Sequence, residues 1–257
     1  MIDPGISFIK NFFGSGFSIF DIDVVVITHS HVDHTADLEA LLTLLYEAND
    51  HKNDNPHRIA IYTNIGAANK FMEFFSAQFG LISDLVIMKP SSEYMLQNLL
   101  QMNTFESNHS DLYAPKENCL GLSFVCKGDD GTNQIKVGIT SDTGYSEKLT
   151  EYYKDLEDNL MIFHIGSILQ DELQLGFPKK TIYSNHLGLR GVFNLIYDIK
   201  PRLALISEIG EEMAGSIHLL PNLLKNVSSK TSILPIDSGV RINLEKFGDP
   251  FCSKCSE

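Results

Sequence analysis

Apolar residues along the chain show two patterns of spacing, one typical of buried strands and one typical of amphipathic helices. The run DVVVIT at 23–28 is almost unbroken in its apolar character and predicts a buried strand. Four leucines follow it at the i, i+3, i+4 and i+7 spacing of one helical face: Leu38, Leu41, Leu42 and Leu45. RIAIYT at 58–63 and GAANKFMEFFSAQF at 66–79 repeat this order of strand and helix.

The rest of the chain continues the same alternation. Further strands are predicted at 84–89, 121–127, 134–140, 160–166, 180–184, 202–207, 231–236 and 240–246. Helices are predicted at 189–199 and 215–227, and GDDGTN at 128–133 has the composition of a hairpin turn. Alternating strands and helices with interspersed hairpins indicate an α/β protein whose sheets carry helices on their outer faces.

Four side chains of the kind that bind metals crowd into the six residues after the first predicted strand. They are His29, His31, Asp33 and His34, in the run HSHVDH. Neutral imidazoles and carboxylates are good ligands for zinc-like ions. A tight loop would aim two of them at one ion and two at another. The alternative is a polar loop that happens to be rich in histidine.

One loop cannot complete two metal sites, so further ligands must come from elsewhere in the chain. His109, Asp142 and His186 each follow a strand-like run and precede a turn, which predicts that they gather at one edge of the sheets. Asp21 or Asp23, just before the first strand, is expected either to hold the second nitrogen of a ligand histidine or to form a turn.

These residues resemble those of metallo-β-lactamase superfamily hydrolases, whose hallmark is the H-x-H-x-D-H motif. IDPG at 2–5 is similar to the end of the family's early strand, and His109, Asp142 and His186 come in the expected order. The resemblance implies one hydrolase domain over 1–257, with an αββα sandwich of two mixed β-sheets flanked by helices. The chain begins directly before the matching segment, so we expect the first strands of the fold to be missing. An open sheet edge would favour a homo-oligomer or a protein partner.

The resemblance also implies a role for each ligand at two divalent metal ions. The first ion would be held by His29, His31 and His109. The second would be held by Asp33, His34 and His186, with Asp142 bridging the two. Zinc is the default, although manganese and iron suit the same donors. Such a centre would generate a bridging hydroxide as nucleophile, and Asp33 would also orient the attacking water.

Within the superfamily the chain is most similar to the tRNase Z-like phosphodiesterase branch. GITSDTGYSE at 138–147, NLMIFHIGS at 159–167 and NHLGLRGVFNLI at 185–196 resemble its segments. The resemblance makes His164 a candidate proton donor to the leaving group; the alternative is a histidine hydrogen-bonded beside the site. Ile165 stands where the branch has a glutamate, and Glu208 stands where it has a histidine. Glu208 is expected to contact His186 or a substrate hydroxyl, or else to be exposed.

Charge and cysteine usage narrow the choice of substrate and compartment. The formal net charge of −13 disfavours long nucleic acids, which bind through many lysine and arginine contacts to phosphate. No apolar run reaches the roughly 18 residues of a membrane span. No secretory signal is visible, and four cysteines make no disulfide framework, so a cytoplasmic location is expected. Cys252 and Cys255 form half of a zinc knuckle of unknown role, whereas Cys119 and Cys126 are expected to be core thiols.

The leading hypothesis is therefore a dinuclear phosphodiesterase or nuclease-type hydrolase acting on a nucleotide or another small anionic phosphodiester. The first alternative is a lactonase or thioesterase, because the same hydroxide attacks acyl carbons. The second is a non-catalytic subunit that keeps the fold as part of a complex.

Overall fold

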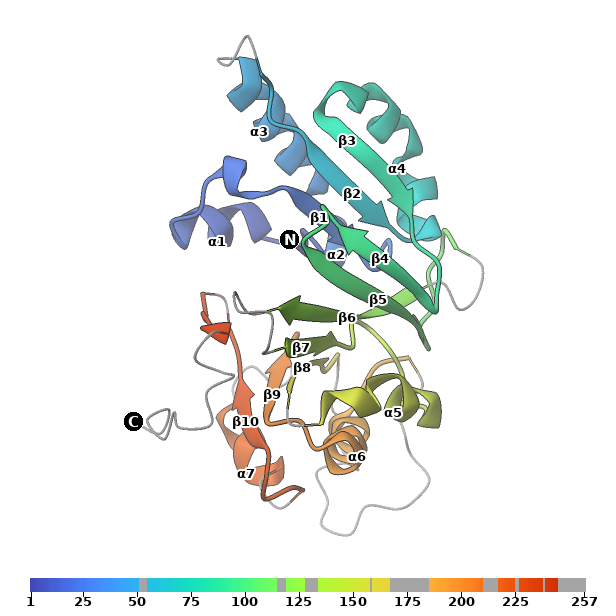
Figure 1. The fold of residues 1–257 in the computed structure, drawn as a ribbon, viewed down its shortest axis with the longest axis vertical. Coiled ribbons are helices and arrows are strands. Elements are labelled where there is room, and N and C mark those ends of the chain that lie inside the picture. Colours follow the sequence, from blue (N-terminus) through green and yellow to red (C-terminus); the bar gives the residue numbers. More distant parts are fainter. Residues whose placement is uncertain are drawn as a thin grey trace. The chain divides into compact units, whose positions relative to one another are not determined.

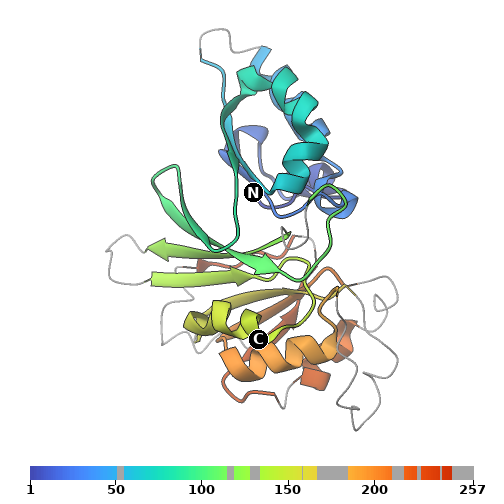
Figure 2. The same ribbon diagram turned by 90° about the vertical axis from the view of Figure 1, so that its right-hand side faces the viewer.

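The computed structural model describes residues 1–50, 55–114, 119–127, 134–157, 159–166, 185–209, 217–224, 227–237 and 239–244. The chain divides into two compact units, which Figures 1 and 2 show from two sides. The first unit comprises Met1–Ser92 and Ser110–Leu120, and the second comprises Glu93–His109 and Gly121–Glu257. Each unit is described by itself. The single domain over 1–257 stays a prediction.

The first unit is built on a parallel sheet with the strand order β1 (Val24–Ile27), β2 (Ile59–Thr63), β3 (Ile82–Ile87). Helices α3 (Leu38–Asp50) and α4 (Ile65–Ala77) form the two crossover connections. Because such crossovers are right-handed, they bring both helices to the same face of the sheet. Figure 2 shows them there, and their buried residues form one core with alternate residues of β1 and β2.

The leucines predicted to face the core do so. Leu38, Leu41, Leu42 and Leu45 are all buried, at 1% exposure or less. Asn64 begins α4, because its side chain accepts a hydrogen bond from the backbone N–H of Ala67. The first unit also contains α1 (Phe8–Gly14), the 3₁₀ helices η1 (Ile19–Asp21) and η2 (Phe79–Leu81), and the single turn α2 (Val32–Thr35).

The N-terminal segment lies along the outer edge of β1. The backbone N–H of Val26 donates to the carbonyl of Met1, and the N–H of Asp3 donates to the carbonyl of Val26. Ile2 and Val26 form a parallel bridge. The edge that the sequence led us to expect open therefore carries backbone hydrogen bonds from residues 1–3, and these bonds fix the position of Asp3.

The second sheet has the order β10-β9-β8-β7-β6-β5-β4 among the described residues. Its strands are β4 (Ser92–Leu96), β5 (Leu100–Ser107), β6 (Cys119–Lys127), β7 (Gln134–Ile139), β8 (Leu160–His164), β9 (Leu203–Ser207) and β10 (Ser232–Pro235). Strands β7 to β10 are parallel, whereas β6 and β7 are antiparallel. Parallel strands end at the same edge of a sheet, so the residues that follow β7, β8 and β9 lie close together at that edge.

Helices pack on one face of these parallel strands. They are α5 (Glu147–Tyr153), with the 3₁₀ helix η3 (Lys154–Leu156), α6 (Leu189–Ile199), and α7 (Leu220–Leu224), preceded by the 3₁₀ helix η6 (Ile217–Leu219). One side of α6 is buried, through Leu189, Val192, Leu195, Ile196 and Ile199, and packs with Met161, Phe163, Ala204 and Ile206 of the strands. This core fixes α6, and with it the loop that carries His186.

Most of the predicted elements are confirmed, but some are wrong. The predicted helix over 215–227 is shorter where it is described, because Pro221 lacks a backbone N–H and suits only the first turn of α7. Residues 240–244 are not a strand: their pattern fits one, but a strand also needs a neighbour to pair with. Helices α1 and α5 and strand β4 were missed. The turn at 128–133 and the strand at 180–184 lie outside the described residues.

Two further expectations concern cysteines and membranes. Cys119 is buried and Cys126 is half-buried, and neither forms a disulfide among the described residues. Cys252 and Cys255 lie outside the described residues. Across the part of the chain that the structure describes, every helix is too short or too polar to cross a bilayer.

Candidate metal centre

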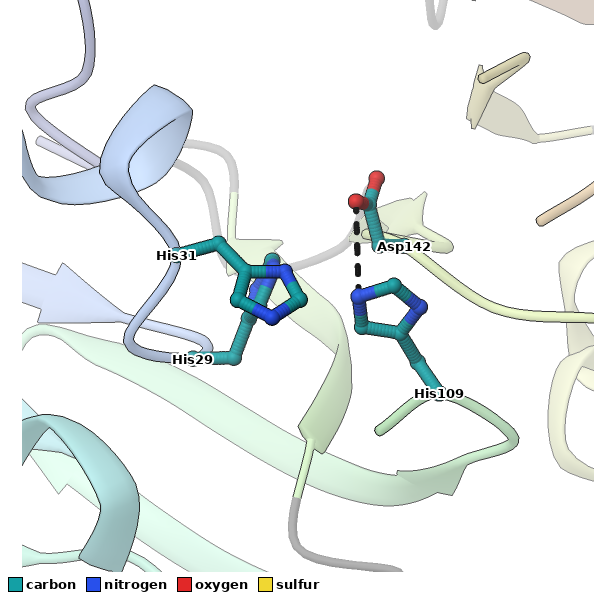
Figure 3. A group of neighbouring side chains, drawn as sticks. All are labelled: His29, His31, His109 and Asp142. Atoms are coloured by element: carbon teal, nitrogen blue, oxygen red, sulfur yellow. Dashed lines mark ion pairs between the residues drawn. The ribbon is translucent and has the colours of Figure 1, made fainter. Parts of the chain in front are cut away.

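The histidine-rich motif lies where β1 ends and α2 begins, in the first unit. His29 and His34 are fully buried, whereas 63% of the Asp33 side chain is exposed. His31 is the N-cap of α2 and has an extended backbone, with φ −62° and ψ 153°. In an extended segment residues i and i+2 point to the same side. His29 and His31 accordingly project together from the end of the strand (Figure 3).

The three imidazoles of the motif lie against one another. The ring of His29 is 4.7 Å from that of His31 and 4.0 Å from that of His34, between centroids. Ligand nitrogens of His29 and His31 lie within 4.8 Å of each other. The Nε2 atom of His34 is 3.9 Å from a carboxylate oxygen of Asp33. The first unit therefore gathers all four residues of the predicted motif.

Asp3 orients two of these histidines. Its carboxylate accepts hydrogen bonds from the backbone N–H of Thr28 at 2.8 Å and from the Thr28 hydroxyl at 2.7 Å. It also lies 3.0 Å from Nδ1 of His34. Because the Thr28 hydroxyl donates to Asp3, it accepts from Nδ1 of His29, 3.1 Å away. With Nδ1 engaged in both rings, Nε2 would be the metal-binding atom of each.

For Asp21 or Asp23 the sequence offered either this orienting role or a turn, and at His34 the orienting carboxylate is that of Asp3. Asp21 instead caps the 3₁₀ helix η1, where its carboxylate accepts from the backbone N–H of Ser18 at 2.7 Å, so the turn alternative is confirmed for it. Asp23 lies 4.0 Å from His57. Asp3 was missed because its nearness to His34 depends on the pairing of residues 1–3 with β1. The IDPG segment, already similar to the family, was the available signal.

Asp142 is the centre of the ligand cluster in the second unit. It lies just past the end of β7, is only 4% exposed, and has three imidazoles within 4 Å. Its Oδ2 atom is 3.8 Å from Nε2 of His109 and 3.5 Å from Nδ1 of His186. Its Oδ1 atom is 3.9 Å from Nδ1 of His164. Figure 3 shows the His109 ring directed at this carboxylate.

The loop after β5 is bound to the loop after β7, which holds His109 beside Asp142. The hydroxyl of Ser107 donates to the backbone carbonyl of Asp142. The N–H of Asn108 donates to the Thr143 hydroxyl at 2.9 Å, and the N–H of Gly144 donates to the carbonyl of Asn108 at 2.8 Å. These bonds fix the distance between two residues that are far apart in the sequence.

His109 and His186 form a second pair of neighbouring imidazoles. Their ring centroids are 4.8 Å apart and the rings are steeply inclined to each other. Nδ1 of His109 is 2.8 Å from the carbonyl oxygen of Asn185, which leaves Nε2 to face Asp142. Gly166 allows His186 its position, because a Cβ atom at residue 166 would overlap the imidazole.

His164 and Glu208 are paired at the ends of two parallel strands. His164 is the last residue of β8 and lies opposite Ser207 of β9, so Glu208 follows directly beside it. The Glu208 carboxylate is 2.9 Å from Nδ1 of His164 and its side chain is 42% exposed. For Glu208 the sequence offered a contact with His186 or a substrate hydroxyl, or else exposure. Its side chain is exposed, and its pairing with His164 was not predicted. Ligand atoms of Asp142, His164 and Glu208 all lie within 4.8 Å of one another.

Three residues at these sites have left-handed backbone conformations. They are Asp3 with φ 45°, Ser141 with φ 51°, and Glu208 with φ 49°. For residues other than glycine this conformation costs about 1–3 kcal/mol, and such strain concentrates at functional sites. Asp3 binds His34, Ser141 immediately precedes Asp142, and Glu208 binds His164. At these three positions the strained backbone belongs to a residue that contacts or directly precedes a member of the clusters, whereas Ser7, Ser91, Gln97, Asn98 and Lys200 have positive φ elsewhere.

The donors of both units suit a divalent cation such as zinc. Neighbouring ligand atoms around tetrahedral zinc are roughly 3.3 Å apart, given metal–ligand distances of about 2.0–2.1 Å. The separations of 3.5 and 3.8 Å from Asp142 to His186 and His109 are slightly larger, so a small contraction would bring these atoms to that spacing. All the predicted ligand residues lie in one or other of these two clusters.

Comparison with known proteins identifies the family and the fold. Residues 1–207 match the model of the β-lactamase superfamily domain. No curated protein sequence matches the chain significantly. Among solved structures, the metallo-β-lactamase fold protein YhfI from Bacillus subtilis is similar, with a TM-score of 0.71 and 17% identity, over 93% of this chain and 85% of that one.

Two further solved structures are similar over a comparable length. The Zn²⁺-bound PqqB of Methylobacterium extorquens has a TM-score of 0.61 and 14% identity, over 94% of this chain and 82% of its own. The short form of human tRNase Z has a TM-score of 0.60 and 15% identity, over 94% and 86%. At such identities the likeness shows the fold alone. Since the family model matches most of the chain, this protein belongs to the metallo-β-lactamase superfamily.

Proposed function

We propose that the protein is a dinuclear metal-dependent hydrolase that cleaves small phosphodiesters. The observation that carries the proposal is the buried Asp142 carboxylate, which has the imidazoles of His109, His164 and His186 within 4 Å. A carboxylate and imidazoles that converge in this way form the nitrogen and oxygen donor set that suits zinc and similar divalent cations. Family membership supports the same conclusion, because hydrolases that use divalent metals are common in the superfamily.

The proposed ligand sets follow the family motif. The first ion would be bound by His29, His31 and His109, and the second by Asp33, His34 and His186, with Asp142 bridging them. Zinc is the proposed metal, which the zinc bound to the similar PqqB supports. Manganese and iron suit the same nitrogen and oxygen donors.

The chemistry would be divided between the metals and the side chains. Two divalent cations held by these residues would supply a nucleophile at neutral pH and would stabilise the negative charge that develops at phosphorus. Asp33, with its side chain 63% exposed, would orient the attacking water. His164 would donate a proton from Nε2 to the leaving oxygen, while Glu208 holds its Nδ1. General acid catalysis of this kind contributes typically 10²–10⁴-fold.

The proposed substrate is a nucleotide or another small phosphodiester. With a net charge of −13 the protein repels long polyanions, but a local cationic centre attracts a small one, since screening limits repulsion to about 8 Å at physiological salt. The similarity of fold to human tRNase Z, an enzyme named for cleaving RNA, supports phosphodiester chemistry. A cytoplasmic location and a self-associating or partner-bound state are part of the proposal.

The test is hydrolysis of bis(p-nitrophenyl) phosphate by the protein loaded with zinc or manganese. We expect turnover by the native protein and none by Asp142→Ala. Asp198→Ala, an exposed change on α6, is the matched control and should behave as the native protein. Full metal occupancy without turnover would favour the lactonase or thioesterase alternative. Absence of both metal and turnover would favour the non-catalytic subunit.

A further inference from the structure

Ser30, which separates His29 from His31, has each of its polar groups bound within the first unit. Its N–H donates to Oδ2 of Asp111 at 2.9 Å and its hydroxyl donates to Oδ1 at 2.5 Å. Its carbonyl accepts from the ammonium group of Lys70 at 2.6 Å. Ser30 is 2% exposed, so these bonds are shielded from water.

The alternation of an extended segment explains why this residue matters. His29 and His31 point to one side of the segment, and Ser30 points to the other. Whatever fixes Ser30 therefore fixes the direction of both imidazoles. Because neither histidine takes part in the bonds to Ser30, these bonds would stay in place when the imidazoles bind a metal.

The carboxylate of Asp111 is also fixed by several hydrogen bonds. The residue is 8% exposed, and besides its two bonds from Ser30 it accepts from the N–H of Tyr113 at 2.9 Å and from the Asn64 amide at 3.2 Å. Burial by itself raises the pKa of this carboxyl, but the hydrogen bonds outweigh burial and lower the pKa. Gly66 accommodates the group, because a Cβ atom there would overlap the carboxylate.

Lys70 completes the arrangement from α4. Its ammonium group donates to the carbonyl of Ser30 and, at 3.1 Å, to the hydroxyl of Thr35, which follows the last ligand of the motif. The Thr35 hydroxyl in turn donates to the carbonyl of His31 at 2.8 Å. The Asp111 carboxylate therefore binds the N–H of Ser30, and the Lys70 ammonium binds its carbonyl. Lys70 also binds Thr35, the residue just after the motif.

We propose that Asp111 and Lys70 are positioning residues that set the direction of His29 and His31 for metal binding through Ser30. The inference rests on the proposed metal centre and adds to it two residues outside the ligand set. Neither residue touches the metal in this proposal. Asp111 follows His109, a proposed ligand, by two positions in the chain.

The test is a cobalt(II) titration followed by visible absorption, with zinc content measured in parallel. We expect Asp111→Asn and Lys70→Met to weaken cobalt binding by roughly 10–100-fold, the usual effect of losing a residue that orients a ligand, and to change the cobalt spectrum. Ser30→Ala removes only one hydrogen bond and should have a smaller effect. Lys70→Arg keeps the cation and should restore most of the affinity.

Two controls separate positioning from loss of stability or charge. Leu45→Ala destabilises the buried side of α3 and Asp84→Asn removes an exposed charge on β3; both should leave the cobalt spectrum unchanged. Native affinity and spectrum in folded Asp111→Asn and Lys70→Met would overturn the inference alone. A native protein that binds neither cobalt nor zinc would overturn it together with the proposed function. Metal binding without phosphodiester hydrolysis would overturn only the phosphodiesterase proposal.

Discussion

The Nδ1 atom of His164 and a carboxylate oxygen of Glu208 lie 2.9 Å apart at the neighbouring ends of β8 and β9. The residue that follows His164 in the chain is Ile165, which is fully buried and cannot orient an imidazole by hydrogen bonding. The adjacent parallel strand supplies the carboxylate instead. The histidine and its acidic partner therefore come from different strands, 44 positions apart in the sequence.

We expect Glu208→Gln to lower kcat for substrates with poor leaving groups far more than for substrates with good ones. A protonated His164 helps an alkoxide to leave, whereas p-nitrophenolate leaves with little help. The measurement is the dependence of kcat on leaving-group pKa across a series of aryl and alkyl phosphodiesters. The slope should become steeper in Glu208→Gln and in His164→Ala, and stay native in the exposed control Glu151→Gln. Equal losses for every leaving group would contradict the acid role.

Asp3→Asn should weaken zinc binding by roughly 10–100-fold while leaving the protein folded. The amide cannot accept all three hydrogen bonds that the carboxylate receives from Thr28 and His34. Isothermal titration with zinc measures the effect. Asp21→Asn is the matched control, because Asp21 also accepts a backbone N–H in the first unit but caps η1. Zinc affinities that fall equally in the two variants would argue against a specific role for Asp3.

Gly5→Ala should impair both folding and metal binding. A Cβ atom at residue 5 would overlap the backbone carbonyl of Asp33, so the motif would have to move. Overpacking of this kind costs about 1–3 kcal/mol. Urea unfolding and a zinc titration report the two effects. Gly14→Ala is the control: a Cβ atom there meets nothing within 4 Å, so this change should slightly stabilise α1. A native unfolding free energy and zinc affinity in Gly5→Ala would contradict the prediction.

Tyr153→Phe should destabilise the protein by about 1 kcal/mol at neutral pH, because the buried hydroxyl donates to the carbonyl of Ile139 at 2.8 Å. Burial raises the pKa of Tyr153 far above its ordinary value of 10.0. Since the folded pKa is the higher one, the hydroxyl's contribution is fully present below pH 10 and is lost as the pH rises towards the folded pKa. Urea unfolding of both proteins at pH 9 and 11 measures this. The native protein should lose about 1.4 kcal/mol relative to the variant, and a constant difference would contradict the assignment.

The features that depend on near neighbours in the chain could be predicted from the amino-acid sequence. The apolar run before His29 and the leucine spacing of α3 arise from interactions between near neighbours, so periodicity was sufficient to predict them. The clustering of His29, His31, Asp33 and His34 is also local, because a strand end followed by one helical turn leaves four such side chains little room to separate. Resemblance to the family then named His109, Asp142 and His186 as their counterparts.

The residues that orient those ligands could not be predicted, because they reach the ligands through contacts between distant parts of the chain. Asp3 reaches His34 through the pairing of residues 1–3 with β1, and Glu208 reaches His164 through the register of β8 and β9. Asp111 meets Ser30 across 81 positions of sequence. A ligand histidine needs only a carboxylate placed beside its second nitrogen, and almost any segment of the chain can supply that carboxylate. The positions of orienting residues therefore leave no fixed spacing in the sequence, whereas ligands that share a loop do.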